Sequence, residues 1–430
     1  MRIWLILTAL AASPVIGKAS NTIYAQELVN RTSAKHPELV AIAMHVTSQS
    51  GDNIIIASNI GRIGQKADAD DLKVIQTGIP HLAVNKAGDR FEVELILKDA
   101  NSRNIGALGI VFPYKAGDDK VALQGRAEGI RDELARHISH RANLLEPAQY
   151  DTTIPTQSYG QSLVDKALLR HRNVVILALH AKAPTSPDNV IVASNIGRIG
   201  KKADDDDLHV IATGEDKLEL NETGDRYEVE QTLLDVSGNT IGAVGVVFAY
   251  TKGLDTAPLV SEAKEVRLEL SRRISNVDNL LQPYPFDAHY PVDTYAQQLV
   301  DDLLAAHTDV LIVAIHAAKP GSKDYVIAAS NIGRIGKAAD DDDMKVIKTS
   351  LPNLEVNATG NRFEAEVPLL DSAKRSIGAL SVVFPYKAGD DKSALRMRAE
   401  KIRDDLAPRI PGSAALFAEQ STHGAAAPAR

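Results

Sequence analysis

Hydrophobic residues recur along the chain at spacings that predict a helix followed by paired strands. Residues 22–36 are predicted to form a helix with Leu28 and Val29 on an apolar face, which the third copy of the pattern repeats as Leu299, Val300, Leu303 and Leu304. The runs "LVAIAMHV" and "NIIIASN" are short and apolar, as in buried strands, and "TSQSGD" between them suits a hairpin loop. The first part of the pattern therefore predicts a helix and then a two-stranded hairpin.

The pattern continues with a short acidic helix, a strand region, two strands and a closing helix. The run "DLKVIQTG" has acidic residues at its start and a glycine at its end, which predicts a short helix. "DRFEVELIL" alternates with period two, which places Arg90, Glu92 and Glu94 on one face and the apolar residues on the inward face. "NIGALGIVFPY" predicts the last strand, and helical spacing over 123–138 predicts the closing helix. The inward residues of the alternating strand are Phe91, Val93, Leu95 and Leu97.

The same pattern occurs three times. "SNIGRIGQKADADD" begins at residue 58, "SNIGRIGKKADDDD" at 194 and "SNIGRIGKAADDDD" at 330, a spacing of about 136 residues. This repetition predicts three tandem domains, over residues 20–146, 147–283 and 284–417. Proline-containing segments between these domains suit linkers, and the tail 418–430 is rich in small residues and is predicted to be disordered.

Three quoted features together resemble the extracellular PAS-like Cache domain family. They are a second strand ending in "ASNIGRIGK", an acidic helix ending in "TG", and a last strand such as "IGALGIVF". The resemblance covers nearly all of each unit. It implies an α+β fold of three PAS/Cache-like domains, each an antiparallel sheet with an N-terminal helix, a short acidic helix and a C-terminal helix. Cache domains usually stand between two membrane spans ahead of an output module, which we do not find here, so we expect ligand capture rather than direct signalling.

The N-terminus has the pattern of a secretory signal peptide. A charged start, the apolar run "IWLILTALAASPVIG" and small residues at Gly17 and Ala19 predict a cleaved segment over residues 1–19, with a buried N-terminal helix as the alternative. No later segment has the roughly 20 apolar residues that a membrane span requires. We therefore expect a periplasmic or secreted protein with no membrane span after removal of the signal peptide.

Composition narrows the classes of function. The chain has 430 residues, a net charge of −8 and no cysteine. Nucleic-acid affinity depends on Lys and Arg contacts to phosphates, so the acidic balance argues against nucleic acid as a partner. The absence of cysteine excludes disulfides and thiolate catalysis.

The loop arginines are the first candidate ligand-binding residues. Arg62 stands between glycines that permit a tight turn. In PAS-like folds this segment borders the ligand pocket, so the resemblance implies a bidentate contact between the arginine and a carboxylate. A turn in which the arginine pairs with neighbouring aspartates is the alternative. The "GRIG" letters also match the loop of KH nucleic-acid modules, but that loop joins two helices and this one follows a strand.

Four further positions complete the candidate ligand site in each copy. His45 has small neighbours that leave room for a ligand, although a buried histidine bonded to a backbone carbonyl is the alternative. Tyr114 ends the last strand, where it stacks on a ligand or packs in the core, and Thr77 ends the acidic helix. Arg90 turns into a pocket or belongs to a solvent-facing ladder of cross-strand charge pairs. The full candidate set is His45, Arg62, Thr77, Arg90, Tyr114, His180, Arg198, Thr213, Arg226, Tyr250, His316, Arg334, Thr349, Arg362 and Tyr386.

The acidic residues favour a helix start over a metal site. Asp68, Asp70 and Asp71 lack the alternating ligands, central glycine and final glutamate of a calcium loop. We therefore predict a solvated helix start, with cation binding as the minor alternative. His45, Ser58 and Asp70 supply the residue types of a catalytic triad, but no "GxSxG" elbow surrounds the serine, and no enzyme activity or cofactor is predicted.

The leading hypothesis is an exported, non-enzymatic protein that binds a small organic anion such as a carboxylate through three Cache-like modules. The alternative is a structural or interaction repeat protein that displays its acidic loops to a protein partner. An enclosed polar cavity beneath residues 58–77 favours binding, and a solid apolar core favours display.

Overall fold

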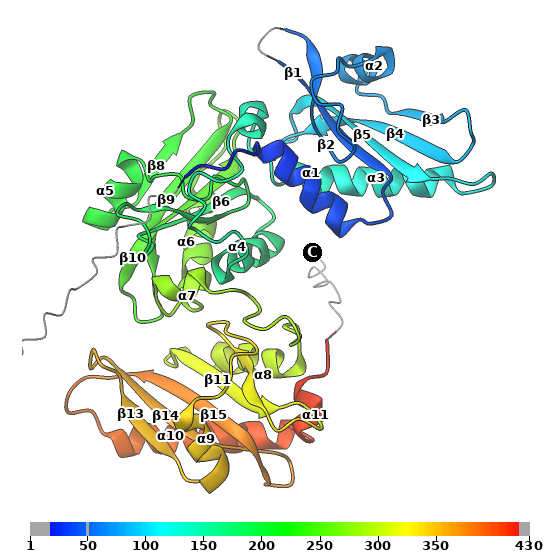
Figure 1. The fold of residues 1–430 in the computed structure, drawn as a ribbon. Coiled ribbons are helices and arrows are strands. Elements are labelled where there is room, and N and C mark those ends of the chain that lie inside the picture. The colour runs from blue at the N-terminus through cyan, green and yellow to red at the C-terminus, as the bar shows by residue number, and fades with distance from the viewer. Residues whose placement is uncertain (1–17, 49–50, 421–430) are drawn as a thin grey trace, which may run out of the picture. The chain divides into compact units, whose positions relative to one another are not determined.

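Three five-stranded antiparallel sheets form the core of this chain (Figure 1). The computed structural model describes residues 18–48 and 51–420. Nearly all of the predicted signal peptide and most of the predicted disordered tail lie outside these residues. Within the described part of the chain, no helix has the length and apolar character needed to cross a bilayer.

The first sheet has the strand order β2-β1-β5-β4-β3, so the N-terminal hairpin is followed by a strand that returns beside β1. The elements of the first repeat are α1 (Tyr24–Lys35), β1 (Ala41–Thr47), β2 (Asn53–Ser58), α2 (Ala69–Thr77), β3 (His81–Val84), β4 (Arg90–Lys98), β5 (Asn104–Pro113), α3 (Lys120–Ala135) and the 3₁₀ turn η1 (Arg141–Leu145).

The other two repeats have the same order of helices and strands up to the closing helix, and the same sheet topology. The second contains α4 (Tyr159–Arg170), β6 (Val174–Ala181), β7 (Val190–Ser194), α5 (Asp205–Thr213), β8 (Lys217–Leu220), β9 (Arg226–Leu234), β10 (Thr240–Ala249), α6 (Ala257–Ser271) and α7 (Val277–Leu281). The third contains α8 (Tyr295–Ala306), β11 (Ile312–Ala318), β12 (Tyr325–Ser330), α9 (Asp341–Thr349), β13 (Asn353–Val356), β14 (Arg362–Leu370), β15 (Ser376–Pro385), α10 (Lys392–Leu406), η2 (Ala407–Arg409) and α11 (Ser413–Leu416). The predicted α+β class and order of elements are confirmed.

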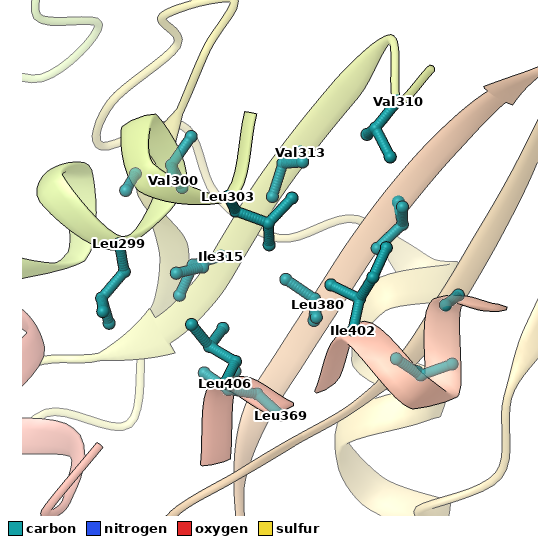
Figure 2. Packing of buried hydrophobic residues seen from close by; sticks show 14 of the residues in the cluster. Leu299, Val300, Leu303, Val310, Val313, Ile315, Leu369, Leu380, Ile402 and Leu406 are labelled. Carbon is teal, nitrogen blue, oxygen red and sulfur yellow. The ribbon is translucent and has the colours of Figure 1, made fainter. Parts of the chain in front are cut away.

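One face of each sheet carries the apolar core. In the third repeat, Leu299 of α8 and Leu406 of α10 lie close to Ile315 and Leu380 of the sheet (Figure 2). The alternating strand of the first repeat buries its apolar side chains in the equivalent cluster, as predicted. The N-terminal and closing helices of each repeat therefore cover the same face of its sheet.

The short acidic helix of each repeat covers the opposite face. In the first repeat Val74 of α2 is fully buried and packs with Ile96 and Ala107 of the sheet. An amphipathic helix must bury its apolar stripe, and the sheet supplies the surface. Each sheet therefore has helices on both faces.

The chain divides into two compact units by its internal contacts. The first contains residues up to 154 together with 182–191 and 196–203, and the second contains 155–181, 192–195 and 204–430. The division cuts through the second repeat, whose loop after β7 contacts the end of the first repeat. Asn143 Nδ2 donates to the Ile196 carbonyl at 3.2 Å, and the Tyr150 N–H donates to the Ile199 carbonyl at 2.7 Å. The domain limits drawn from the sequence repeats stay a prediction.

Candidate functional site

The acidic helix begins with a reciprocal pair of hydrogen bonds. Asp68 Oδ1 accepts from the backbone N–H groups of Asp70 and Asp71, at 2.9 and 3.1 Å, and Asp71 Oδ2 accepts from the Asp68 N–H at 3.1 Å. The other two copies form the same capping box, with Asp204 and Asp207, and with Asp340 and Asp343. The predicted helix start is confirmed, and the local role of these aspartates is to satisfy the first N–H groups of the helix.

The predicted solvation of this helix start is wrong for its inner aspartate. Asp71 is only 3% exposed, because it lies on the side of α2 that faces the sheet. His45 on β1 lies next to Asp71, with its Nδ1 3.2 Å from Asp71 Oδ2. The same pair measures 2.5 Å between His180 and Asp207. These histidines therefore have a carboxylate partner.

Burial and charge act on the histidine in opposite directions. Burial lowers the pKa of His45, because a protonated imidazole loses its hydration, and the charges of Asp71 and Asp68 raise it by a smaller amount. The net pKa lies below the usual value. His316 and Asp343, whose Nδ1 and Oδ1 atoms lie 2.8 Å apart, repeat the arrangement in the third copy.

A buried glutamate joins each pair from β4, β9 or β14. Glu94 is 6% exposed, and the prediction that its strand face is a solvent-facing ladder is wrong for this residue, because α2 covers that face. Burial is the largest cause that raises the pKa of Glu94 to about 9, and the charge of Asp71 adds to it. The pKa values of Glu230 and Glu366 are raised to about 9 in the same way.

We call each group of two helix-start aspartates and this glutamate an acidic cluster. In the first repeat, oxygens of Asp68, Asp71 and Glu94 lie within 4.8 Å of one another. The other clusters are Asp204, Asp207 and Glu230, and Asp340, Asp343 and Glu366. The glutamate was not identified as a site residue from the sequence. The alternating pattern assigns Glu94 to one face of the strand, but it does not show which element covers that face. The apolar residue Val74 on α2 was the available signal, since it must pack against a sheet.

The loop arginines lie outside the acidic clusters and have different surroundings in the three repeats. Arg62 is exposed on its loop. Arg198 donates from Nε and Nη2 to Glu146, at 2.8 Å each, and Arg334 donates from Nε to Gln282 Oε1 at 3.2 Å. In the second and third repeats the arginine thus contacts the end of the preceding repeat.

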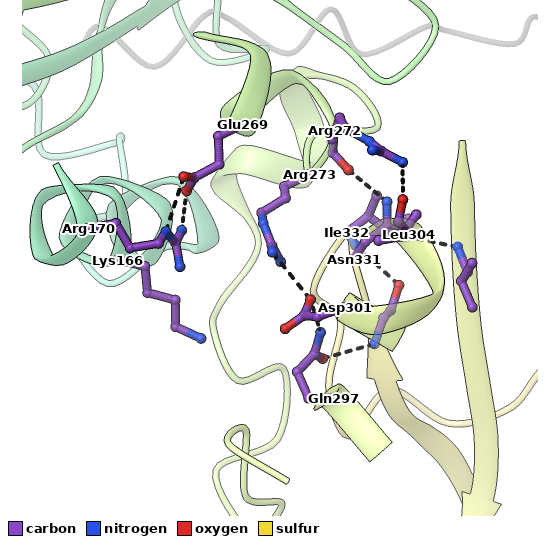
Figure 3. Close-up of polar contacts among 12 residues, drawn as sticks. Lys166, Arg170, Glu269, Arg272, Arg273, Gln297, Asp301, Leu304, Asn331 and Ile332 are labelled. Atoms are coloured by element: carbon purple, nitrogen blue, oxygen red, sulfur yellow. Dashed lines mark hydrogen bonds and ion pairs between the residues drawn. The ribbon is translucent and has the colours of Figure 1, made fainter. Parts of the chain in front are cut away.

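Further contacts hold the loop of the third repeat against the end of the second (Figure 3). Asn331 Nδ2 in the loop donates to the Arg272 carbonyl at 2.7 Å. Arg273 pairs at 3.2 Å with Asp301, which belongs to α8 of the third repeat. The fully buried Asn279 donates to the Ile332 carbonyl at 2.8 Å. These contacts give this loop a structural role.

The threonine and tyrosine candidates stabilise local structure. Thr77 is exposed and its hydroxyl donates to the Lys73 carbonyl at 2.8 Å, in the last turn of α2. Thr213 and Thr349 make the same bond to the residue four positions earlier. The Tyr114 ring lies 5.9 Å from the Phe91 ring, on the core face opposite the acidic cluster, and Tyr250 and Tyr386 pair likewise with the aromatic residue of their own neighbouring strand.

The strand arginines are also separate from the acidic clusters. Arg90 is exposed, whereas Arg226 is only 8% exposed. Arg362 donates to Asp235 Oδ2 at 3.1 Å and to the Ser237 hydroxyl at 2.6 Å. Of the five candidate residues in each repeat, only the histidine contacts the acidic cluster.

A cleft of about 490 Å³ lies in the first repeat beside α2, near the segment where the sequence hypothesis placed a cavity. Ile75, Ile96 and Ile105 form its apolar part, and Arg103 and Arg141 are among its polar lining residues. Asp99, which is 1% exposed, orients Arg103 through a 2.7 Å bond to its Nε. His140 and Asn104 also line the cleft, and the second and third copies have Val277 and Ser413 in place of Arg141.

Comparisons with known proteins identify no family. No family model matches the chain, and no curated protein does. Among solved structures, the chain is similar to the GAF domain of A. aeolicus nlh2, with 16% identity, 26% of this chain and 80% of that chain covered, and a TM-score of 0.22. It is also similar to the periplasmic domain of RsbU from Chlamydia trachomatis, with 8% identity, coverage of 56% and 78%, and a TM-score of 0.18. Likenesses of this size carry no argument about function.

Proposed function

We propose that the chain is an exported, non-enzymatic binding protein for a small organic anion, and that the cleft of the first repeat is its binding site. The cleft is the observation that supports this proposal. Its volume of about 490 Å³ falls within the range of ~300–1,000 Å³ that is typical of small-molecule sites. An apolar floor with a few convergent polar groups is also typical of such sites.

The charges in the cleft favour an anion. Arg103 and Arg141 bring two guanidinium groups to the cleft, and the carboxylate of Asp99 offsets one of them. Arginine matches the geometry of a carboxylate because its N–H groups bind both oxygens at once. The ligand class predicted from sequence is therefore kept, and its binding site moves from the loop arginine to the cleft.

Thermal denaturation of the full chain tests the proposal. Small carboxylates, amino acids and their uncharged analogues are added to the wild type, to Arg141→Ala and to Arg62→Ala. A ligand at a hundredfold excess over its Kd stabilises the folded state by ~2.7 kcal/mol, which is readily seen as a shift in melting temperature. We expect a shift with anions that Arg141→Ala abolishes and Arg62→Ala retains. Loss of the shift in Arg62→Ala alone would return the site to the loop, and no shift with any compound would refute the function.

The interaction-protein alternative is favoured by one other observation. Ile60 and Ile63 in the first loop are 48% and 55% exposed. The equivalent residues of the other loops are buried: Ile196 and Ile332 for Ile60, and Ile199 and Ile335 for Ile63. Exposed apolar residues on a loop that elsewhere makes contacts suit a protein partner. Analytical ultracentrifugation of the wild type and of Ile63→Asp tests whether the partner is a second copy of the chain. In that case the wild type sediments as a dimer and the variant as a monomer.

A further inference from the structure

Each acidic cluster brings three carboxyl groups together at the start of the acidic helix. Asp71 and Glu94 are 3% and 6% exposed, and an oxygen of Asp68 lies within 4.8 Å of both. Charges removed from water are costly unless they are paired. His45, whose Nδ1 lies 3.2 Å from Asp71 Oδ2, is the basic side chain beside the first cluster. The cluster therefore requires a further positive charge or a proton.

Unpartnered oxygens point into the first two clusters. Within the described residues, Glu94 Oε2 and Asp71 Oδ1 are buried and have no hydrogen-bond partner. In the second repeat Glu230 Oε2 is likewise buried without a hydrogen-bond partner. Asp207 Oδ1 and, in the third repeat, Asp343 Oδ1 each have a histidine Nδ1 beside them, at 2.5 and 2.8 Å. Buried carboxylate oxygens are normally satisfied, so Glu94 Oε2, Asp71 Oδ1 and Glu230 Oε2 indicate a ligand for the two clusters.

The third cluster differs in one respect that makes it an internal control. Glu366 Oε2 accepts a hydrogen bond from Asn353 Nδ2 at 3.3 Å, and Glu366 Oε1 accepts one from Ser381 Oγ at 3.5 Å. The first two repeats have Gly109 and Gly245 where the third has Ser381, so they lack that hydroxyl. Glu366 therefore accepts hydrogen bonds from protein side chains, whereas Glu94 Oε2 and Glu230 Oε2 accept none among the described residues.

We propose that the acidic clusters of the first and second repeats each bind a divalent cation of the oxygen-preferring class, Ca²⁺, Mg²⁺ or Mn²⁺. In the first, the ligands are Asp68 and Asp71 from the start of α2 and Glu94 from β4. Carboxylate oxygens are what these ions prefer. His45 orients Asp71 through its Nδ1 contact, in the way that neighbouring groups commonly fix metal ligands. The site has no linear sequence motif, because its ligands come from two separate elements.

The size of the clusters supports an ion over an organic molecule. All three ligand oxygens lie within 4.8 Å of one another, which is about the separation of two oxygens on opposite sides of one ion with bonds of ~2.0–2.6 Å. The cleft proposed for the anion has no lining residue in common with the cluster. The two proposals therefore stand independently.

Isothermal titration calorimetry on the full chain, freed of metal by chelation and dialysis, tests the cation site. CaCl₂, MgCl₂ and MnCl₂ are titrated separately, and melting temperatures are recorded with and without each ion. We expect a stoichiometry of about two ions per chain for at least one of the three and a higher melting temperature with that ion. Bound Mn²⁺ also gives a direct electron paramagnetic resonance signal.

Three isosteric variants assign the ions to the clusters. Glu94→Gln and Glu230→Gln should each remove one ion, the double variant should lose the melting shift, and Glu366→Gln should bind as the wild type does. Circular dichroism confirms that each variant is folded. The inference is overturned if no ion binds, in which case a proton shared between the carboxyl groups neutralises the cluster. It is equally overturned if ions bind without regard to Glu94 and Glu230, since they then lie on exposed aspartates.

Discussion

Replacing Arg198 by alanine measures how strongly the loop of the second repeat is held. The guanidinium binds both carboxylate oxygens of Glu146 at 2.8 Å, and both side chains are 20% exposed. Exposed ion pairs contribute ~0–1 kcal/mol, and breaking a fully buried pair costs ~3–5 kcal/mol. This half-buried bidentate pair lies between those limits, so we expect R198A to lower the free energy of unfolding by ~1.5–3 kcal/mol.

Two matched variants exist because the same loop occurs in three surroundings. R334A removes one hydrogen bond to the neutral Gln282 and should cost less, ~0.5–1.5 kcal/mol. R62A removes an exposed side chain to which the described residues give no hydrogen bond or ion pair, and should cost less than ~0.5 kcal/mol. All three arginines have φ of 64–65°, so the strain of a non-glycine residue in the left-handed region is shared and cancels in the comparison.

Urea denaturation followed by far-UV circular dichroism, repeated across pH, provides the assay. Burial raises the pKa of Glu146, but the hydrogen bond and charge of Arg198 outweigh it, so the net pKa is lowered. A lowered folded-state pKa stabilises the protein above the unfolded pKa of ~4.3, and that stabilisation is lost as the pH falls through the folded pKa. The cost of R198A should be complete at neutral pH and shrink in acid. A cost equal to that of R62A, or one unchanged in acid, would refute the reasoning.

Three further predictions concern buried contacts and the N-terminus. Asn279→Ala should cost ~2–3 kcal/mol in urea denaturation, because it leaves the buried Ile332 carbonyl without its donor; a cost below ~1 kcal/mol would contradict this. A Cβ at Gly197 would lie 2.5 Å from the Tyr24 ring, and at Gly61 it would meet nothing within 4 Å, so Gly197→Ala should lower the melting temperature more than Gly61→Ala. Equal shifts in these two variants would argue against the clash. Mass spectrometry of the protein from its native host should show loss of about the first 19 residues, and an intact N-terminus would contradict export.

The fold could be predicted from the sequence because each element has its own period. Leu28 and Val29 share a helical face, and Phe91 to Leu97 alternate as a strand, so periodicity alone gave the element order. The capping box of Asp68 and Asp71 begins α2, and Gly78 in the left-handed conformation ends it. Both signals can be recognised in the sequence.

The candidate site was less predictable because side-chain surroundings depend on contacts between distant elements. The alternation that placed Glu94 away from the core was correct, but α2 folds over that face and buries it. Arg62, Arg198 and Arg334 have the same neighbours in sequence, yet Arg62 is exposed, Arg198 binds Glu146 and Arg334 binds Gln282. The partners of the last two come from the end of the preceding repeat. A local sequence pattern predicts neither which helix covers a strand face nor which residues of the neighbouring repeat contact a loop.

The contacts between the end of one repeat and the loop of the next bear on how the chain can be divided experimentally. A fragment beginning at residue 284 would lack Asn279 and Gln282, which contact the loop around Arg334. The buried Ile332 carbonyl would then lose its Asn279 donor, and Arg334 would lose its hydrogen bond to Gln282. Fragments of the third repeat should therefore begin before Asn279, so that each soluble piece carries the end of its predecessor.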